Sequence, residues 1–417
     1  MSRATLNIEK KDILFPELRF QEFVDNWTKI KNTIQIIAGN AYSLNDYQDE
    51  GVILIQGINI TPGKLDITNI NYIAENHKSK HIVLSEGDIL LGLNRPVTNG
   101  ELKVCRYSLK TKGYLYQRAG KLNFNNEQIN SNFLYQFLRS DNFLKDISNE
   151  LVGSDQPYIR SNLFQVTKLN FPTLSEQQKI ASFLSAVDEK IQQLSRKKEL
   201  LEQYKKGVMQ QLFSGKLRFK DENEKDYPDW EEKKLGEVAN RVIRKNKENN
   251  INVLTISAQL GLVSQLEYFN KSVSAKDVKN YYLIERNDFA YNKSYSKGYP
   301  MGAIKRLKKY DKGVVSTLYI CFSFREMVSL NFMEHYFEYG LHNKEIEKVA
   351  QEGARNHGLL NIGVKDFLNI ELILPSIIEQ QKIANFLSSI DDKIENTNKQ
   401  ITQTQTFKKG LLQQMFV

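Results

Sequence analysis

The stretch "FPTLSEQQKIASFLSAVDEKIQQLSRKKELLEQYKKGVMQQLF", from Phe171 to Phe213, decides the fold of this chain. It aligns without a gap on "LPSIIEQQKIANFLSSIDDKIENTNKQITQTQTFKKGLLQQMF", which begins at Leu374. Equivalent residues lie 203 positions apart (375 − 172 = 203). A repeat with a fixed period indicates one structural unit that is used twice.

The repeat extends upstream of this stretch, although the match weakens toward the start of each half. The tripeptide "LRF" occurs at Leu18 and again at Leu217, and Trp27 has a counterpart in Trp230. A chain of 417 residues is long enough for two hydrophobic cores. We therefore expect two domains that share one fold but have diverged in sequence.

The repeated stretch predicts a long helix. Ser175 and Gln178 have the spacing of a capping box, so the helix is expected to begin there and would run about 58 Å to Phe213. Lys198 and Lys205 interrupt its apolar seam, and we expect their charges to lie in water. The apolar residues are spaced alternately by four and three, as in a coiled coil: Ile180, Leu184, Val187, Ile191, Leu194, Leu201, Val208 and Leu212.

The second copy has an equivalent seam with a more polar middle, between Asn396 and Thr406. Two helices of equal length and seam pair most simply with each other. Antiparallel pairing would place the two domains at opposite ends, related by a pseudo-two-fold axis, whereas parallel pairing would crowd them together. The alternative is two amphipathic helices that pack into separate globular cores.

Short β-rich runs such as "GVILIQGINI" and "VVSTLYICFSF" lie between turn residues in each half, beside helical stretches such as "NFMEHYFEYGLHNKEIEKVA". The expected fold class is therefore mixed α/β (α+β), with two α/β domains and two long helices in an antiparallel coiled coil. We place the first domain at residues 1–170, the first long helix at 171–215, the second domain at 216–373 and the second long helix at 374–417.

Composition predicts a soluble protein that binds a polyanion. The 58 Lys and Arg residues exceed the 49 Asp and Glu residues, which gives a net charge of +9. No stretch has the roughly 18 apolar residues of a membrane span, and the start lacks the apolar core of a signal peptide. Cys105 and Cys321 lack the spacing of a zinc site or a disulfide framework. We expect a cytoplasmic protein with reduced thiols.

Base edges of DNA are read by Arg, Lys, Asn and Gln side chains in particular, and two predicted loops in each half carry such residues. Equally, any one of these residues could be part of an ordinary surface loop. In the first half the candidates are Asn94, Arg95, Gln156, Tyr158 and Arg160. In the second half they are Asn292, Lys293, Ser294, Tyr295, Lys297, Arg355, Asn356 and His357.

Basic clusters in the second half are candidates for phosphate contact, which fixes position but not sequence, or for plain solvated surface. One cluster comprises Arg241, Arg244, Lys245 and Lys247, and the other Lys305, Arg306, Lys308, Lys309 and Lys312.

Signatures of catalysis or metal binding are missing from the sequence. Each Gly-Lys pair is followed by Leu, so there is no phosphate-binding P-loop. Asp229 and Glu231 only faintly suggest a nuclease, and His77 and His81 have no third ligand nearby. We therefore expect no active site and no metal.

The pattern Pro-x-x-x-Glu-Gln-Gln-Lys-Ile-Ala, at 172–181 and at 375–384, resembles the start of the long helices in specificity subunits of type I restriction-modification systems. Its duplication at domain-length spacing extends the resemblance over nearly the whole chain. The loop "GSDQPYI" at Gly153 is also similar to that family, whereas "GARNHGLL" at Gly353 departs from it.

This resemblance implies two target-recognition domains, each of which reads one half of a bipartite, asymmetric site in double-stranded DNA, with the helices setting the gap. It also implies that two modification subunits dock on the helices, and that restriction subunits join the full complex. S-adenosylmethionine, ATP and Mg would then be bound by the partners, and none by this chain. For the docking surface we expect Gln177, Gln178, Phe183, Gln380, Gln381 and Phe386. The alternative function is a duplicated scaffold that binds proteins only.

Overall fold

The computed structural model describes residues 16–30, 33–75, 81–153, 156–167, 169–269, 278–350 and 360–416. The chain forms two compact units. Unit 1 comprises Met1–Arg196 together with Asn398–Val417, and unit 2 comprises Lys197–Thr397. Each unit therefore contains one globular domain and a part of both long helices. The division into domains by residue number remains a prediction.

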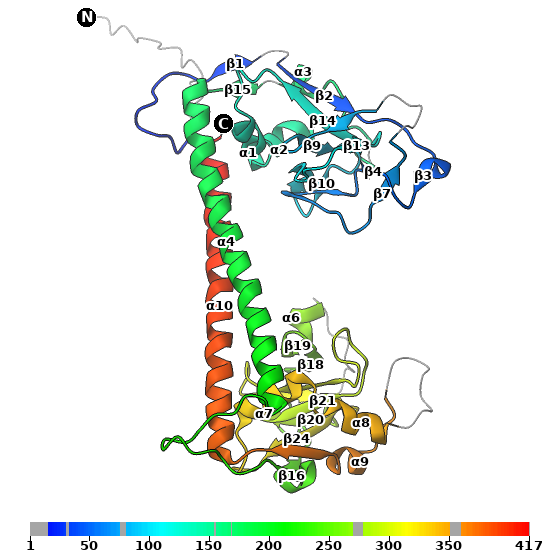
Figure 1. The fold of residues 1–417 in the computed structure, drawn as a ribbon, viewed down its shortest axis with the longest axis vertical. Helices are drawn as coiled ribbons and strands as arrows, with labels where there is room; N and C mark the ends of the chain where they lie inside the picture. The colour runs from blue at the N-terminus through cyan, green and yellow to red at the C-terminus, as the bar shows by residue number, and fades with distance from the viewer. Residues whose placement is uncertain are drawn as a thin grey trace, which may run out of the picture. The chain divides into compact units, whose positions relative to one another are not determined.

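Unit 1 is built from short strands and short helices that precede the long helix α4 (Leu174–Phe213) (Figure 1). Its helices are α1 (Ser131–Phe137), α2 (Asp141–Ser148), α3 (Leu163–Val166) and the 3-10 helix η1 (Leu44–Asp46). Its strands are β1 (Thr28–Ile30), β2 (Ile34–Ala38), β3 (Tyr47–Gln48), β4 (Val52–Ile55), β5 (Ile60–Thr61), β6 (Lys64–Leu65), β7 (Asn71–Ile73), β8 (Val83–Leu84), β9 (Ile89–Gly92), β10 (Val97–Thr98), β11 (Glu101–Leu102), β12 (Val104–Arg106), β13 (Gly113–Leu115), β14 (Ala119–Phe124) and β15 (Leu169–Phe171).

Unit 2 has the same kinds of element before the long helix α10 (Ile377–Gln414). Its helices are α5 (Leu235–Val238), α6 (Gln265–Phe269), α7 (Leu330–Tyr339), α8 (Asn343–Val349) and α9 (Val364–Leu368). Its strands are β16 (Glu231–Lys234), β17 (Ala239–Arg241), β18 (Leu254–Ser257), β19 (Gly261–Ser264), β20 (Tyr282–Glu285), β21 (Phe289–Asn292), β22 (Ala303–Arg306), β23 (Lys312–Val315), β24 (Ile320–Phe324) and β25 (Glu371–Leu374).

The central sheets of the two units have the same topology. Unit 1 contains a four-stranded sheet in the order β12-β9-β14-β2, and unit 2 contains β22-β21-β24-β17. All neighbours in both sheets are antiparallel. A two-stranded pairing directly precedes each long helix, β1 with β15 and β16 with β25. This shared order confirms the predicted mixed α/β internal repeat.

The outer strands differ between the units. In unit 1, β13 pairs with β4 in parallel and completes a five-stranded sheet, β3-β7-β4-β13-β8. In unit 2 the corresponding strands form two separate two-stranded sheets, the hairpin of β18 with β19 and the antiparallel pair of β20 with β23. Among the residues of unit 2 that the structure describes, a single parallel bridge, Val253 with Val314, takes the place of the parallel pairing in unit 1. Divergence is therefore concentrated away from the central sheet.

Helix α4 begins one residue earlier than the sequence suggested, at Leu174 instead of Ser175. In unit 1 the hydroxyl of Thr173 accepts a hydrogen bond from the backbone N–H of Glu176 at 3.4 Å, and Ser376 does the same for Glu379 in unit 2. A hydroxyl at this position satisfies one of the N–H groups that a helix leaves unbonded. The expected cap at Ser175 is therefore wrong, and Thr173 caps α4.

The two long helices run antiparallel in each unit. In unit 1, Leu184 of α4 lies in one hydrophobic cluster with Leu411 and Met415 of α10. In unit 2 the ends are reversed, with Leu212 of α4 clustered with Ile383 of α10. The start of one helix thus packs beside the end of the other, as expected. Each of these helix ends also joins the core of the adjacent globular domain.

Lys205, one of the two lysines of α4 that were expected to reach water, pairs with an acidic side chain instead, and Lys408 in the seam of α10 does the same. In unit 1, Lys408 is 4% exposed and donates hydrogen bonds to the carboxylate of Asp188 at 2.6 and 2.7 Å. In unit 2, Lys205 contacts the carboxylate of Asp391 at 2.5 Å. Because a buried ammonium loses its hydration, each lysine needs an acidic partner on the facing helix.

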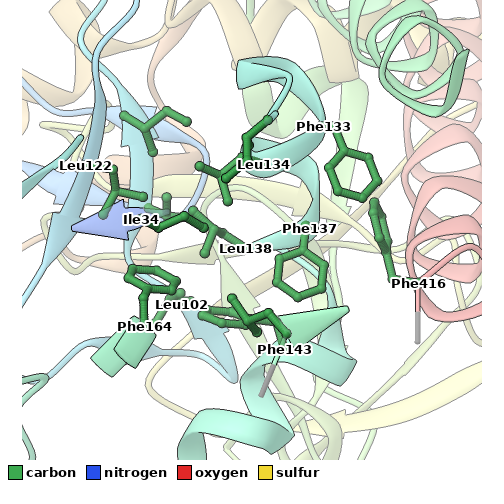
Figure 2. Close-up of a cluster of buried hydrophobic side chains, with 14 of the residues drawn as sticks. Ile34, Leu102, Leu122, Phe133, Leu134, Phe137, Leu138, Phe143, Phe164 and Phe416 are labelled. Carbon is green, nitrogen blue, oxygen red and sulfur yellow. The ribbon is translucent and has the colours of Figure 1, made fainter. Parts of the chain in front are cut away.

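The core of unit 1 contains a group of phenylalanine rings among Leu and Ile side chains (Figure 2). Phe133 and Phe137 of α1 lie 5.5 and 5.8 Å from the ring of Phe416, which follows the end of α10. Burial of a phenylalanine contributes roughly 1.5–3 kcal/mol. These rings fasten the end of α10 to the domain that α4 leaves.

Candidate nucleic-acid interface

Two predicted loops of the first half come together in unit 1. Asn94, which follows β9, forms a β-bridge with Tyr158. The backbone N–H of Arg95 donates to the carbonyl of Pro157 at 2.7 Å. The backbone N–H of Ile159 donates to the carbonyl of Leu93 at 2.9 Å. Segments more than 60 residues apart in sequence therefore form one surface, which no local pattern could have indicated.

This surface presents polar side chains outward. Arg95, Gln156, Tyr158 and Arg160 are all exposed, whereas Asn94 is half-buried. Within the described part of unit 1, the side chains of Arg95, Gln156 and Arg160 form no hydrogen bond or ion pair. Donors that are exposed and unpaired are available to an outside ligand, as base reading requires.

The corresponding loop of unit 2 begins after β21. Asn292 accepts a hydrogen bond from the backbone N–H of Ser294 at 3.1 Å, which leaves its amide group as the available donor. Lys293 and Ser294 are half-buried, whereas Lys297 and Tyr295 are exposed, the latter at 65%. The second loop, with Arg355, Asn356 and His357, lies outside the described residues. The backbone N–H of Leu360, the next described residue, donates a hydrogen bond to the carbonyl of Lys293 in the first loop at 3.0 Å.

A hydrogen-bonded group supports the unit 2 loop, and of its members the sequence had singled out Lys305 but not Tyr299 or Glu338. Lys305 donates to the hydroxyl of Tyr299 at 2.9 Å and to the carboxylate of Glu338 at 2.6 Å. Burial would raise the pKa of Glu338, but Lys305 outweighs this effect and lowers it. Burial also raises the pKa of Tyr299. Tyr299 lies in the loop between β21 and β22, Lys305 in β22 and Glu338 in α7, so no local sequence pattern indicated that they would meet.

The basic clusters of unit 2 are mostly engaged with acidic side chains. Arg244 pairs with Asp288 and Lys309 with Glu267. Arg306 and Lys308 share Glu334, and Lys312 lies 3.0 Å from Glu248. Such pairing reduces the positive potential of these clusters. The basic clusters are therefore weaker candidates for phosphate contact than the loops are.

The start of each long helix is joined to its domain by the same contacts. In unit 1, Arg19 donates to both carboxylate oxygens of the buried Glu176 at 2.7 Å. In unit 2, Arg218 donates to those of Glu379 at 3.2 and 2.8 Å. Bidentate pairing of this kind is strong and directional. The repeated "LRF" tripeptide therefore secures the helix start.

Gln177 and Gln380 do not fit the expected docking role. Both side chains are 2% exposed. Gln177 accepts from the backbone N–H of Asn130 and donates to the carbonyls of Gln128 and Pro172. Gln380 accepts from the N–H of Ser329 and donates to the carbonyl of Pro375. The prediction that these two glutamines face a partner is wrong, because they satisfy backbone groups of their own domain.

The other four predicted docking residues have more accessible positions. Gln178 and Gln381 are exposed on their helices. Phe183 is 37% exposed and meets Phe20 edge-on at 5.8 Å, and Phe386 is half-buried and meets Phe219 edge-on at 5.6 Å. Their role in docking stays a prediction.

Among the described residues there is no group of three or more His, Cys, Asp or Glu side chains that could hold a metal. Asp229 lies beside Arg218, and Glu231 pairs with Lys233. His77 is outside the described residues, while His81 stacks on Tyr114. Burial raises the pKa of Cys105 and of Cys321 to about 12, so these thiols are protonated at neutral pH. In the same described ranges, no helix is both long and apolar enough to cross a membrane.

Comparison with known proteins defines the class of this chain. The family model for the type I restriction modification DNA specificity domain matches residues 25–203 and again residues 227–405. Together these matches cover most of the chain, so the chain belongs to this family. It is a specificity subunit of a type I restriction-modification system, with two target-recognition domains.

Curated relatives carry matching names. The type I restriction enzyme MjaVIII specificity subunit of Methanocaldococcus jannaschii is 33% identical over 214 residues, which is 50% of each chain. The putative MjaX specificity subunit of the same organism is 26% identical over 96% of this chain and 95% of the relative. The EcoKI specificity subunit of Escherichia coli is 21% identical over 89% of this chain and 83% of the relative.

Solved structures show the same fold at low identity. The S subunit of a type I restriction-modification system from M. genitalium has a TM-score of 0.55 at 17% identity, and covers 97% of this chain and 99% of its own. A chain from a study of complex assembly and conformational transition in a type I system has a TM-score of 0.53 at 15% identity, and covers 93% and 96%.

Proposed function

We propose that this specificity subunit reads a bipartite, asymmetric DNA target and performs no catalysis of its own. Unit 1 reads one half-site through Asn94, Arg95, Gln156, Tyr158 and Arg160. Unit 2 reads the other through the loops at 292–297 and 355–357. Helices α4 and α10 set the gap between the half-sites.

The observation that carries this proposal is a contrast within the repeat. The central sheets have the same strand order, whereas the loops that follow β9 and β21 present different side chains. One scaffold with two different loop surfaces suits two different DNA sequences. Direct reading depends on which donors and acceptors reach the base edges, so different loops imply different half-sites.

We further propose that two modification subunits dock on the long helices. The near-identical helix starts support this, because two copies of one partner need two equivalent surfaces. Gln178, Phe183, Gln381 and Phe386 remain candidates for that contact. Restriction subunits join the full complex, and the partners supply the sites for S-adenosylmethionine, ATP and Mg. This chain then binds none of those cofactors.

The decisive experiment maps methylated bases in DNA exposed to the full complex. Replacing residues 16–170 with the equivalent part of another family member should change one half-site and leave the other unchanged. The reciprocal replacement of residues 216–373 is the matched control. A replacement that altered both half-sites would contradict the division of labour.

The spacing role has its own test. Seven residues inserted after Lys197 and seven after Gln400 keep the two helices in register and lengthen each by about 10 Å. We expect the gap to grow by about three base pairs, since DNA rises 3.4 Å per step, with both half-sites unchanged. The alternative, a protein-only scaffold, predicts that the complex binds DNA no better at low salt than at high salt, whereas we expect a steep salt dependence.

A further inference from the structure

Arg95 has a backbone conformation that its side chain does not favour. Its φ is 44°, in the left-handed region. Asn99 and Gly100, at the tip of the β10–β11 hairpin, also have positive φ, but Asn and Gly suit such turns. An arginine there costs about 1 kcal/mol and persists only where the surroundings enforce it. Strained backbone conformations of this kind are frequent at binding and active sites.

The surroundings hold this residue on both sides. Its N–H donates to the carbonyl of Pro157 at 2.7 Å, and the bridge from Asn94 to Tyr158 fixes the residue before it. The next residue, Pro96, is buried, and its carbonyl accepts from the N–H of Lys103 at 2.6 Å. Pro96 also has a fixed φ. Arg95 therefore projects from a backbone that is rigid before any ligand arrives, which lowers the entropy lost on binding.

The guanidinium of Arg95 has no partner within the described part of unit 1, unlike those of Arg106 and Arg139. Arg106 donates to the carbonyls of Gly87 and Ser131, and Arg139 lies 3.7 Å from Asp188. Arg95 is exposed, and no side chain in the described ranges pairs with it. A planar fork of donors matches O6 and N7 of guanine in the major groove, the commonest specific contact of arginine with a base.

Unit 2 has a different residue at the same place. Arg95 is the third residue after β9, and Tyr295 is the third residue after β21. Tyrosine has no guanidinium and cannot form the same two bonds. The two units therefore present different exposed side chains at equivalent positions.

We propose that Arg95 reads a guanine in the half-site recognised by unit 1. The proposal rests on the proposed function and names one determinant within it. Arg95 is thus a specificity-determining residue, whereas Pro96 and Pro157 position it.

The test uses the complete complex, with methylation mapping and binding to synthetic duplexes. The variant Arg95→Ala removes the guanidinium, and Arg95→Gly removes it while the backbone keeps its φ without strain. We expect both variants to accept other bases at one position that is guanine in the wild-type target. The discrimination at that position should fall roughly ten-fold to a hundred-fold.

A second measurement ties the residue to the base. Replacing that guanine with 7-deazaguanine removes the N7 acceptor. Wild-type binding should weaken, whereas Arg95→Gly should show no further loss, so that the two changes are not additive. Tyr295→Ala is the matched control, and it should leave this half-site unchanged.

Other outcomes would overturn the proposal. If the Arg95 variants bound all DNA sequences equally more weakly, with a shallower salt dependence, Arg95 would be a phosphate contact. If the Arg95 variants lost base discrimination at an A·T pair instead, Arg95 would read a base other than guanine. Failure of the wild-type complex to methylate any bipartite target would instead refute the proposed function, so the two failures are distinguishable.

Discussion

The two units agree where each long helix begins and differ where each presents its loops. Arg19 with Glu176 and Arg218 with Glu379 are equivalent bidentate pairs on buried carboxylates. By contrast, the exposed Arg95 of unit 1 stands where unit 2 has Tyr295. The common contacts are those that fasten a helix to a domain, and the differing ones face outward. The contacts that hold the helix starts and the side chains that we propose to read DNA therefore lie in separate parts of the same fold.

A second difference lies inside the units, around equivalent carboxylates on the long helices. In unit 1, Gln136 of α1 donates to Asp188 at 2.8 Å. In unit 2, the equivalent residue of α7 is His335, whose Nδ1 lies 3.9 Å from Asp391. An amide remains neutral at every pH, whereas an imidazole can gain a proton. The units should therefore respond differently to acid.

The largest expected effect concerns the buried carboxylates at the helix starts. In unit 1, the indole N–H of Trp27 also donates to Glu176, at 3.4 Å, whereas among the described residues the indole N–H of Trp230 in unit 2 has no partner. Arg218→Ala should therefore destabilise unit 2 by about 3–5 kcal/mol. Arg19→Ala should destabilise unit 1 by about 1 kcal/mol less than this, because the indole N–H of Trp27 still donates to Glu176.

Each unit contains one of the two tryptophans, so fluorescence during urea unfolding reports on both units separately. Lys179→Ala, which removes an exposed pair with Glu22, is the control and should cost less than about 1 kcal/mol. Equal losses in the two arginine variants would show that the indole contact has no energetic weight.

Acid should destabilise unit 2 more than unit 1. Burial lowers the pKa of His335 to about 4, reinforced by Lys205, and burial lowers that of His342 to about 4. Because unfolded histidine titrates near 6.5, the unfolded chain binds protons first, and stability is lost as the pH falls from about 6.5 toward 4. At pH 5 the loss is about 2 kcal/mol for each histidine.

The exchange His335→Gln gives unit 2 the residue that unit 1 has at the equivalent position. It should remove about half of the extra acid sensitivity of unit 2, and adding His342→Leu should remove the rest. Urea unfolding at pH 7 and pH 5, followed by Trp230 fluorescence, measures this difference. An unchanged acid response in the double variant would assign it to other groups.

A smaller effect is expected at the ion pairs between the helices. Lys408 has a side chain that is 5% exposed, and burial, together with Arg139, lowers its pKa to about 8. Asp188→Asn should therefore cost unit 1 about 2 kcal/mol. Asp391 is 43% exposed, so Asp391→Asn should cost unit 2 about 1 kcal/mol or less. Thermal unfolding of both variants compares the two pairs directly, and a larger loss for Asp391→Asn would reverse this ranking.

The smallest expected effect separates paired from unpaired lysines in unit 2. Lys297→Ala should lower the slope of log affinity against log salt by about 1, as for loss of one phosphate contact. Lys309 is held by Glu267, so Lys309→Ala should leave the slope nearly unchanged. DNA binding by the complex at several salt concentrations gives both slopes. If both variants lowered the slope equally, the basic clusters would also be phosphate contacts.

Much of this architecture could be predicted from the sequence because its signals are local or periodic. The 203-residue repeat, the apolar seams and the turn-bounded β runs each follow from the residues themselves. The docking role of Gln177 and Gln380 could not be judged in this way. Both residues belong to the repeated motif, but a repeated residue can serve the interior as well as a partner.

The sequence by itself determined that this chain is one fold written twice and that each copy carries a long helix with an apolar seam, because periodicity is readable without coordinates. It favoured antiparallel pairing of these helices, which only their packing shows. Only the tertiary structure decided that Arg95 lies against Pro157, that Lys408 is buried with Asp188, and that each "LRF" secures a helix start. These contacts join residues far apart in the chain. Their energies depend on burial and geometry, which no spacing along the sequence records.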